Sequence, residues 1–302
     1  MFTLTANHLK QLFELNEFPL NSNAMQFAGL RGCIPVNPGD QDLAVKHALA
    51  TTALDYQHPR CTLVQWTPND GEFAVYPGST VPHQDSVASS RRRGGAGANQ
   101  LLTGFYGDYR KGWHKAGKPT GHEAWRQTAS RPIRRTGDDL DYDPDDRVEI
   151  VNPSDNLHCG WCSGMESKYS SAGCQVVIGF PKCAKRDQAP ATGAWKLFQA
   201  RGYATNQQSF GYALFNGGEV QRLVLAGVKG LERVRFGSEG PRAESVQKAM
   251  KAKGFYEGVV DRQFGARSLR SLLDFQEAIF GPGGDDGICG PQTADALGIE
   301  WP

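Results

Sequence analysis

The sequence lacks a long apolar run and an excess of either charge, and both absences restrict what the protein can be. No stretch approaches the roughly 18 to 20 apolar residues that a membrane-spanning helix requires, so we expect no membrane span. The 33 basic residues are balanced by 32 acidic ones, which gives no reason to expect a nucleic-acid partner. With 39% apolar residues and a mean hydropathy of −0.49, the composition is that of a soluble globular protein.

The N-terminus lacks the features of a signal peptide. Residues 1–18 interleave leucines and phenylalanines with polar residues such as Asn7, Lys10 and Glu14. This pattern favours a short amphipathic helix, because a secretory leader needs a basic start, an unbroken apolar core and a small-residue cleavage site. We therefore expect a protein that is made in the cytoplasm and is not exported by a classical leader.

The seven cysteines cannot all pair, so a monomer has at least one free thiol. Cys159 and Cys162 form a Cys-Gly-Trp-Cys motif beside His158, and Cys183 follows. A redox dithiol and half of a zinc site are alternatives here, but a second close pair of ligands is missing. We expect these three to be packed or disulfide-forming, Cys174 to be the free thiol, and the remaining cysteines to be buried fillers: Cys33, Cys61 and Cys289.

A histidine and a cysteine in a small-residue turn form the strongest candidate site. His158 precedes Cys174 by sixteen residues, and the cysteine follows Ser171-Ala172-Gly173. A thiol is a weak nucleophile near its ordinary pKa of about 8.5, and an imidazole that takes its proton makes it reactive. Small residues let a substrate approach and leave backbone N–H groups for an oxyanion. The pattern predicts Cys174 as nucleophile and His158 as base, with the turn as oxyanion site.

A second group of chemically useful residues lies upstream, in residues 112–127. This segment combines His114 and His122 with two tryptophans and Glu123, a mixture suited to the wall of a substrate site. His122 is the alternative base, and Glu123 could orient either imidazole. A surface histidine without a role is an equal interpretation for His122.

The order His158, then Ser171-Ala172-Gly173-Cys174, resembles the signature of the L,D-transpeptidases, the YkuD-like fold, in which a histidine precedes Ser/Thr-His-Gly-Cys. The resemblance implies that Cys174 accepts the acyl group, that His158 is the general base, and that Ser171 and Gly173 shape the turn. Ala172 stands where the signature has a second histidine. Val176 stands where it usually has an arginine, which removes a cation that could meet a substrate carboxylate.

The C-terminal residues resemble a peptidoglycan-binding domain of the three-helix type. A turn of the form Asp-x-x-Phe/Cys-Gly-x-x-Ser/Thr occurs at 261–268 and again at 286–293. Gly265 and Gly290 are expected to take positive φ, and Ser268 and Thr293 to cap the helices that follow. A helical module without a ligand is the alternative. The resemblance implies a groove for peptide stems, with three weak candidates that could equally be cap or core residues: Asp261, Phe264 and Gln276.

Between the termini the pattern predicts strands. Residues 61–66 and 72–76 read as a hairpin around a Pro-Asn-Asp-Gly turn, and residues 211–215 and 220–225 as another around Asn-Gly-Gly. Further strands are expected at 147–151 and 175–180, and a helix at 41–54.

The expected architecture has three parts. A helical segment spans 1–23, a mainly β, L,D-transpeptidase-like catalytic domain with a β-sandwich and short helices spans 24–235, and a small all-α three-helix domain spans 237–302. The acidic segment 138–146 lacks the glycine and terminal glutamate of a calcium-binding EF-hand. We expect no metal and no cofactor.

The two resemblances together predict a bacterial cell-wall enzyme with peptidoglycan as its partner. Its cysteine would form a thioacyl intermediate on a stem peptide, resolved by an amine (transpeptidation or exchange) or by water (carboxypeptidase or endopeptidase). Without a leader, delivery to the wall or periplasm would be non-classical, as for a phage endolysin or a secreted effector, with lysis proteins, a secretion apparatus or an immunity protein as further partners.

Two alternatives remain for the function. One is a wall-binding scaffold without chemistry, in which Ala172 marks the loss of the site. The other is a muramidase with Glu123 as its acid, which would need a second placed carboxylate that the sequence does not identify.

Overall fold

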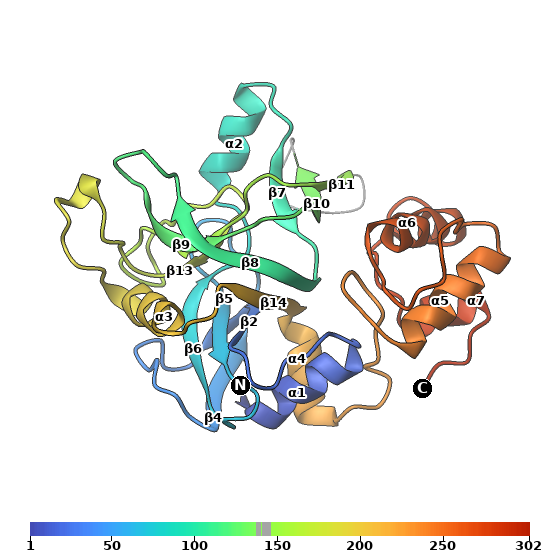
Figure 1. Ribbon diagram of the computed structural model, residues 1–302. Coiled ribbons are helices and arrows are strands. Elements are labelled where there is room, and N and C mark those ends of the chain that lie inside the picture. Colours follow the sequence, from blue (N-terminus) through green and yellow to red (C-terminus); the bar gives the residue numbers. More distant parts are fainter. Residues whose placement is uncertain (137–139, 141–145) are drawn as a thin grey trace.

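The computed structural model describes residues 1–136, 140 and 146–302 of the chain (Figure 1). Most of the acidic segment 138–146 lies outside the described residues. Within the described part, a closed barrel of eight strands occupies the centre, and three C-terminal helices lie beside it. No described helix has the length and apolarity to cross a membrane.

The barrel is built in the order β12-β13-β6-β5-β2-β14-β8-β9. The mainly β prediction is confirmed, but the strands close into a barrel where a sandwich was predicted. Closure depends on β14, which comes late in the chain and inserts between β2, in parallel, and β8, in antiparallel orientation. The barrel strands are β2 (Gln26–Arg31), β5 (Cys61–Trp66), β6 (Phe73–Ser79), β8 (Gly104–His114), β9 (His122–Arg126), β12 (Leu157–Cys159), β13 (Gln175–Val177) and β14 (Ser209–Asn216).

Two small sheets flank the barrel, in the orders β1-β4-β3 and β11-β10-β7. The helix predicted at 41–54 is wrong, because this segment contains strand β4. Its side chains alternate between exposed and buried, with His47 and Leu49 inward, and it pairs with β1. The flanking strands are β1 (Phe2–Thr5), β3 (Cys33–Pro35), β4 (Lys46–Thr51), β7 (Ala98–Leu101), β10 (Arg131–Thr136) and β11 (Val148–Val151).

The two predicted hairpins have opposite outcomes. The first is confirmed, since β5 and β6 pair antiparallel with Trp66 opposite Phe73. The second is wrong, because β14 ends at Asn216 and helix α4 (Gly217–Ala226) follows directly. Asn216 forms a capping box with Glu219 there, so a turn-like sequence starts a helix instead of reversing a strand.

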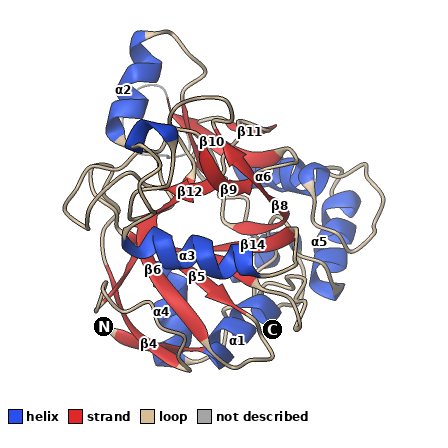
Figure 2. Cartoon of the chain, turned by 60° about the vertical axis from the view of Figure 1, so that its left-hand side comes forward, coloured by secondary structure: helices blue, strands red, loops and turns tan. Residues whose placement is uncertain are grey.

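Two further helices of the N-terminal 235 residues pack on the barrel. α1 (Ala6–Leu15) places Phe13 among Trp66, Phe105 and Phe215, so the N-terminal segment shares one hydrophobic core with the barrel. α3 (Gly193–Ala204) lies across the strands on another side (Figure 2). The other elements are α2 (Gln84–Arg92) and a short 3-10 helix (Ala184–Arg186).

The C-terminal region is helical, as predicted, and has a core of its own. Its helices are α5 (Pro241–Ala252), α6 (Ala266–Phe280) and α7 (Pro291–Leu297). Gly265 and Gly290 have φ of −91° and −114°, so the positive φ expected of them is wrong, and they occupy the N-cap positions themselves. Ser268 and Thr293 therefore do not cap. Their hydroxyls meet buried glutamines of the preceding helices.

Those two glutamines explain the repeated turn. Gln247 of α5 donates to Asp261 Oδ1 and accepts from the Asp261 N–H, and Gln276 of α6 donates to Asp286 Oδ1 and accepts from the Gly287 N–H. In each turn, the amide of one buried glutamine is thus the hydrogen-bond partner of both a carboxylate oxygen and a backbone N–H.

The C-terminal helices are tied to the N-terminal segment through Glu17. Its carboxylate oxygens accept from the backbone N–H groups of Arg242 and Ala243, in the first turn of α5. A carboxylate at a helix N-terminus satisfies free amides and complements the helix dipole. The helical region is therefore joined to the barrel at a defined contact.

Candidate functional site

Strand pairing brings the predicted nucleophile and base together. β12 and β13 are parallel neighbours, with His158 opposite Val176. Because β13 begins directly after Cys174, His158 lies close to that cysteine. Both side chains are buried, with exposed fractions of 2% and 7%. A ring nitrogen of His158 and the Cys174 Sγ belong to a cluster whose potential ligand atoms all lie within 4.8 Å of one another. The predicted juxtaposition is therefore present in the fold.

The third member of that cluster is His114, which was not singled out as a site residue. His114 ends β8 and pairs with His122 on β9. Its ring stacks on the His158 ring, with centroids 3.8 Å apart and planes at 14°, while the His122 ring is 5.6 Å from His158. Three imidazoles from three strands thus gather at one end of the barrel.

Backbone contact fixes the orientation of the His158 ring. Its Nδ1 lies 2.7 Å from the Cys159 carbonyl oxygen. A carbonyl can only accept, so Nδ1 carries the proton of the neutral ring and Nε2 keeps a lone pair. Burial, and then the neighbouring His114 and His122, hold the pKa of His158 well below its ordinary value. The ring is neutral at physiological pH and can accept a proton.

The turn before Cys174 is held by its own side chains. Ser171 Oγ donates to the Cys174 carbonyl at 2.8 Å and accepts from the Gly173 N–H at 3.1 Å. Gly173 has φ of +136°, and a Cβ there would lie 1.9 Å from Asn99 Nδ2, so only glycine fits. The Gly173 amide is thus already bonded within the turn, so of the amides around the turn only those of Ala172 and Cys174 remain candidates for the predicted oxyanion site.

Cys174 is surrounded by groups that oppose its ionisation. Its Sγ lies 3.7 Å from the Ser154 carbonyl and 4.0 Å from Asp155 Oδ1. Burial raises the pKa of the thiol strongly, and the Asp155 charge raises it further, whereas the N–H groups of Asn156 and Cys174 lower it. Burial also raises the pKa of Asp155 to about 7. The site therefore rests as a neutral thiol beside a neutral imidazole.

His122 lies near the His158 ring, whereas Glu123 is turned away from both imidazoles. His122 is buried, its Nδ1 bonds the Thr120 carbonyl at 2.8 Å, and its Nε2 has no partner. Glu123 is exposed and accepts from Gln199, so it orients neither imidazole. Both line a cavity of about 550 Å³ whose lining includes His122 but neither Cys174 nor His158. His122 and Glu123 therefore form part of the wall of this neighbouring cavity.

His114, His158 and Cys174 have the spacing of metal ligands, but the hydrogen bonds made by the two rings do not both suit a metal. A ligating histidine donates its second N–H to an acceptor. His158 does so, but His114 Nδ1 faces Asn156 Nδ2 at 3.0 Å, and an amide nitrogen is a donor. The cluster does not fit a metal centre. Among the described residues all seven cysteines are free and buried, including Cys159, Cys162 and Cys183.

The three weak candidates for wall binding all have internal contacts. Phe264 and Gln276 are buried, with exposed fractions of 1% and 2%. Asp261 accepts from Gln247, and this contact and the Gln263 N–H hold the pKa of its carboxyl below the ordinary value. All three side chains therefore stabilise the repeated turns or the core beneath them.

We expect Gln276→Leu to lower the stability of the helical region by about 2 kcal/mol, because the Gly287 N–H and three acceptors, on Asp286, Ile288 and Thr293, lose their partner. Chemical denaturation followed through the region's own unfolding transition measures this. The exposed neighbour Glu277→Gln is the matched control. A Gln276→Leu variant that unfolds like the wild type but no longer binds cell walls would instead assign Gln276 to the ligand groove.

Asp155, Asn99 and Asn156 are site residues that sequence reasoning missed. Asn99 Nδ2 donates to Asp155 Oδ2, and Tyr109 donates to the Asp155 carbonyl at 3.0 Å. Asn156 stands two residues before His158, which was the one available signal. Asn99 approaches from β7, far away in the sequence, and no local pattern marks it.

Comparison with known proteins identifies one region. Residues 239–297 match the family described as "Putative peptidoglycan binding domain", which supports the predicted helical domain and peptidoglycan as a partner. The match covers the repeated turns and all three C-terminal helices. No curated protein and no solved structure matches the chain.

Proposed function

We propose that this chain is a peptidoglycan-targeting cysteine enzyme that acts on stem peptides through a thioacyl intermediate. The observation that carries the proposal is the proximity of His158, on β12, to Cys174, which directly precedes the parallel strand β13, with the His158 Nδ1 proton held by a backbone carbonyl. The match at 239–297 supports targeting to the cell wall. The resemblance to L,D-transpeptidases supplies the reaction class.

In the proposed reaction the Cys174 proton moves to His158 Nε2 as the sulfur attacks a stem-peptide carbonyl carbon. A C–S bond forms, and the oxygen gains negative charge near the Ala172 and Cys174 amides. The C–N bond then breaks, and the leaving amine takes the proton from His158. An incoming amine or a water finally attacks the thioester carbon and gives its proton to His158 Nε2; the C–S bond breaks, and the sulfur of Cys174 takes that proton from His158. Transferase and hydrolase activity differ only in that last nucleophile.

The resting electrostatics fit a site that needs its substrate. A raised thiol pKa and a lowered imidazole pKa disfavour proton transfer before the substrate is bound. A substrate bound against the turn would bring its carbonyl carbon to the sulfur and its carbonyl oxygen to the Ala172 and Cys174 amides. The buried neutral thiol is also the observation that favours the second candidate, a wall-binding scaffold without chemistry.

Mass spectrometry of muropeptides separates the two. Purified protein is incubated with peptidoglycan and with isolated tetrapeptide muropeptides, as wild type, Cys174→Ala and His158→Ala. We expect Cys174→Ala to form no product and His158→Ala to be slower by about 10²- to 10⁴-fold, the usual contribution of a general base. Cys61→Ala, a buried cysteine on β5, is the control and should keep activity. Wall binding with unchanged muropeptides in the wild type would overturn the enzyme proposal.

A further inference from the structure

Two imidazole rings stack beside Cys174, those of His114 and His158, but only His158 has a role in the proposed reaction. The rings come from β8 and β12 and lie almost parallel at 3.8 Å. Their nearest ring nitrogens and the Cys174 Sγ fall within 4.8 Å of one another. Two imidazoles therefore face one thiol, and their protonation states decide what each can do.

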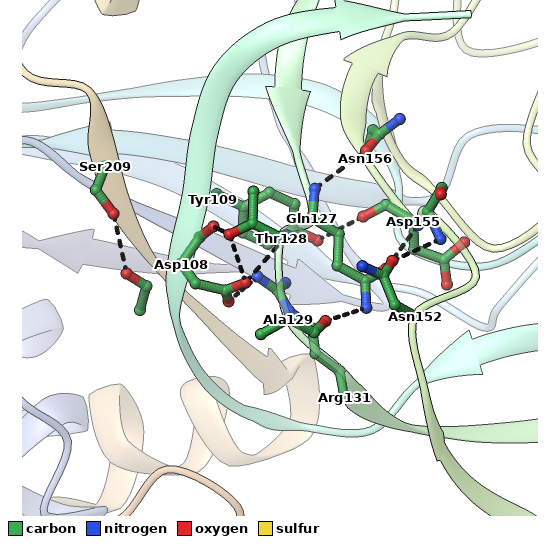
Figure 3. Close-up of polar contacts among 12 residues, drawn as sticks. Asp108, Tyr109, Gln127, Thr128, Ala129, Arg131, Asn152, Asp155, Asn156 and Ser209 are labelled. Atoms are coloured by element: carbon green, nitrogen blue, oxygen red, sulfur yellow. Dashed lines mark hydrogen bonds and ion pairs between the residues drawn. The ribbon is translucent and has the colours of Figure 1, made fainter.

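A relay of two hydrogen bonds fixes the tautomer of His114. The Gln127 backbone N–H donates to Asn156 Oδ1 at 3.0 Å, which assigns the oxygen of that amide (Figure 3). The amide nitrogen is then turned toward His114 Nδ1, also at 3.0 Å, and it can only donate. His114 Nδ1 must accept, so the proton of the neutral ring is on Nε2.

The two rings consequently carry opposite tautomers. His158 has its proton on Nδ1, bonded to the Cys159 carbonyl, and a lone pair on Nε2. His114 has its lone pair on Nδ1 and its proton on Nε2. Since both Nδ1 atoms are engaged, Nε2 is the nitrogen that each ring can offer to the sulfur, one as acceptor and the other as donor.

We propose that His114 is a third catalytic side chain of this site, whose Nε2–H donates to the Cys174 sulfur as the thiolate forms. This inference rests on the proposed cysteine chemistry. The proton of the thiol goes to His158 Nε2, and the negative charge left on sulfur is met by the His114 N–H. A hydrogen bond to the charged form of an acid favours that form. The donor is fixed before the reaction by the Gln127 and Asn156 contacts.

The surroundings keep His114 a neutral donor. Burial lowers the pKa of His114 to about 3, and neighbouring His122 and Lys115 lower it in the same direction. The ring therefore does not compete with His158 for the thiol proton. Around Cys174 the other ionisable groups are Asp155, which opposes the thiolate, Lys115, which favours it, and the buried hydroxyl of Tyr109. His114 offsets the opposition of Asp155.

The first test measures the thiol directly and requires no enzyme activity. Iodoacetamide alkylation of Cys174 is followed between pH 6 and 10 by peptide mass spectrometry, for wild type, His114→Leu and His114→Gln. We expect His114→Leu to react about tenfold more slowly at pH 7, the effect of one charge-assisted hydrogen bond. His114→Gln, which keeps an N–H donor, should recover most of the rate. Equal pH profiles for wild type and His114→Leu would overturn the proposal.

The second test changes the tautomer without touching the ring. Asn156→Asp keeps an oxygen for the Gln127 N–H but presents an acceptor to His114 Nδ1, which moves the proton away from Nε2. We expect slower alkylation of Cys174, together with a new ability to bind Co²⁺, seen as a thiolate-to-cobalt absorption band, because His114, His158 and Cys174 then fit a metal. Wild type should show no such band. A cobalt–thiolate band in the wild type would overturn the assigned tautomer and favour a metal centre.

The alkylation measurements and the muropeptide assay can fail separately. Inactivity on muropeptides with a His114-dependent thiol would reject the substrate and keep the assignment of the donor. Activity on muropeptides together with a thiol whose alkylation does not depend on His114 would support the proposed function and reject His114 as the donor. Circular dichroism of each variant confirms that the barrel is folded before its alkylation is compared.

Discussion

Asp155→Asn is expected to stabilise the protein at pH 8 and to leave its stability almost unchanged at pH 4. Burial raises the pKa of Asp155 from 3.8 to about 7. A carboxyl group whose pKa is raised by folding favours the folded state below pH 4, and that contribution is lost as the pH rises to 7. The full difference corresponds to about 4 kcal/mol at pH 8, at 1.36 kcal/mol for each pH unit between the two pKa values.

Urea denaturation of wild type and Asp155→Asn at pH 4, 6 and 8 measures this difference. The amide keeps an oxygen for Asn99 Nδ2, so the packing around residue 155 is preserved. Asp42→Asn, at an exposed carboxylate, is the matched control and should show no trend with pH. A stability difference that is the same at all three values would mean that Asp155 is ionised in the folded protein throughout.

The same substitution should make Cys174 more reactive. Asp155 Oδ1 is 4.0 Å from the sulfur, and its charge raises the pKa of the thiol. An amide removes that charge and offers an N–H in its place. The alkylation rate of Cys174 at pH 8 should therefore rise in Asp155→Asn, opposite to the effect expected of His114→Leu.

Asp108→Ala is expected to lower the free energy of unfolding by about 3 kcal/mol, because it leaves a buried guanidinium without its counter-charge. Arg131 has an exposed fraction of 1%, pairs with Asp108, and lies with its guanidinium 4.0 Å from the Tyr109 ring centroid. Its Nε and Nη1 have no hydrogen-bond partner. The ion pair with Asp108 is therefore the main compensation for burying this charge.

The effect should reach the site, because Asp108 Oδ2 also accepts from the Thr128 N–H, next to the Gln127 amide that holds Asn156. Chemical denaturation measures the loss of stability. Glu166→Ala is the control, since it breaks the exposed Arg60–Glu166 pair and should cost less than about 1 kcal/mol. If both variants lost the same small amount, the buried guanidinium would have found other compensation. Adding Arg131→Met to Asp108→Ala should recover part of the loss.

Local patterns predicted much of the secondary structure and failed where a residue had two possible uses. The hairpin at 61–76 and the three C-terminal helices were predicted from turn residues and helical spacing. The Asn-Gly-Gly segment after β14 was read as a turn, but it begins a helix because Glu219 completes a capping box. The alanine-rich segment at 46–51 became a strand because β1 and β3 pair with it.

In the candidate site, too, some residues were predicted from local patterns and others depend on the pairing of distant strands. Cys174, His158 and the glycine of the turn were predicted because their spacing is local. His114 was visible only as one of two histidines in a rich segment, and its importance depends on the cross-strand register of β8, β9 and β12. His122 was the alternative base, and Glu123 a residue that could orient an imidazole; both line a cavity whose lining includes neither Cys174 nor His158.

The sequence by itself determined the presence of a helical wall-binding region, the repeated turns within it, and a thiol preceded by an imidazole. Each depends on residues close together in the chain, where spacing and turn chemistry are sufficient. Only the tertiary structure decided that the strands close into a barrel, that Asp155 and Asn99 meet beside Cys174, and that His114 stacks on His158. These depend on pairings between distant strands, and the hydrogen bonds that set each ring's proton exist only once those strands have met.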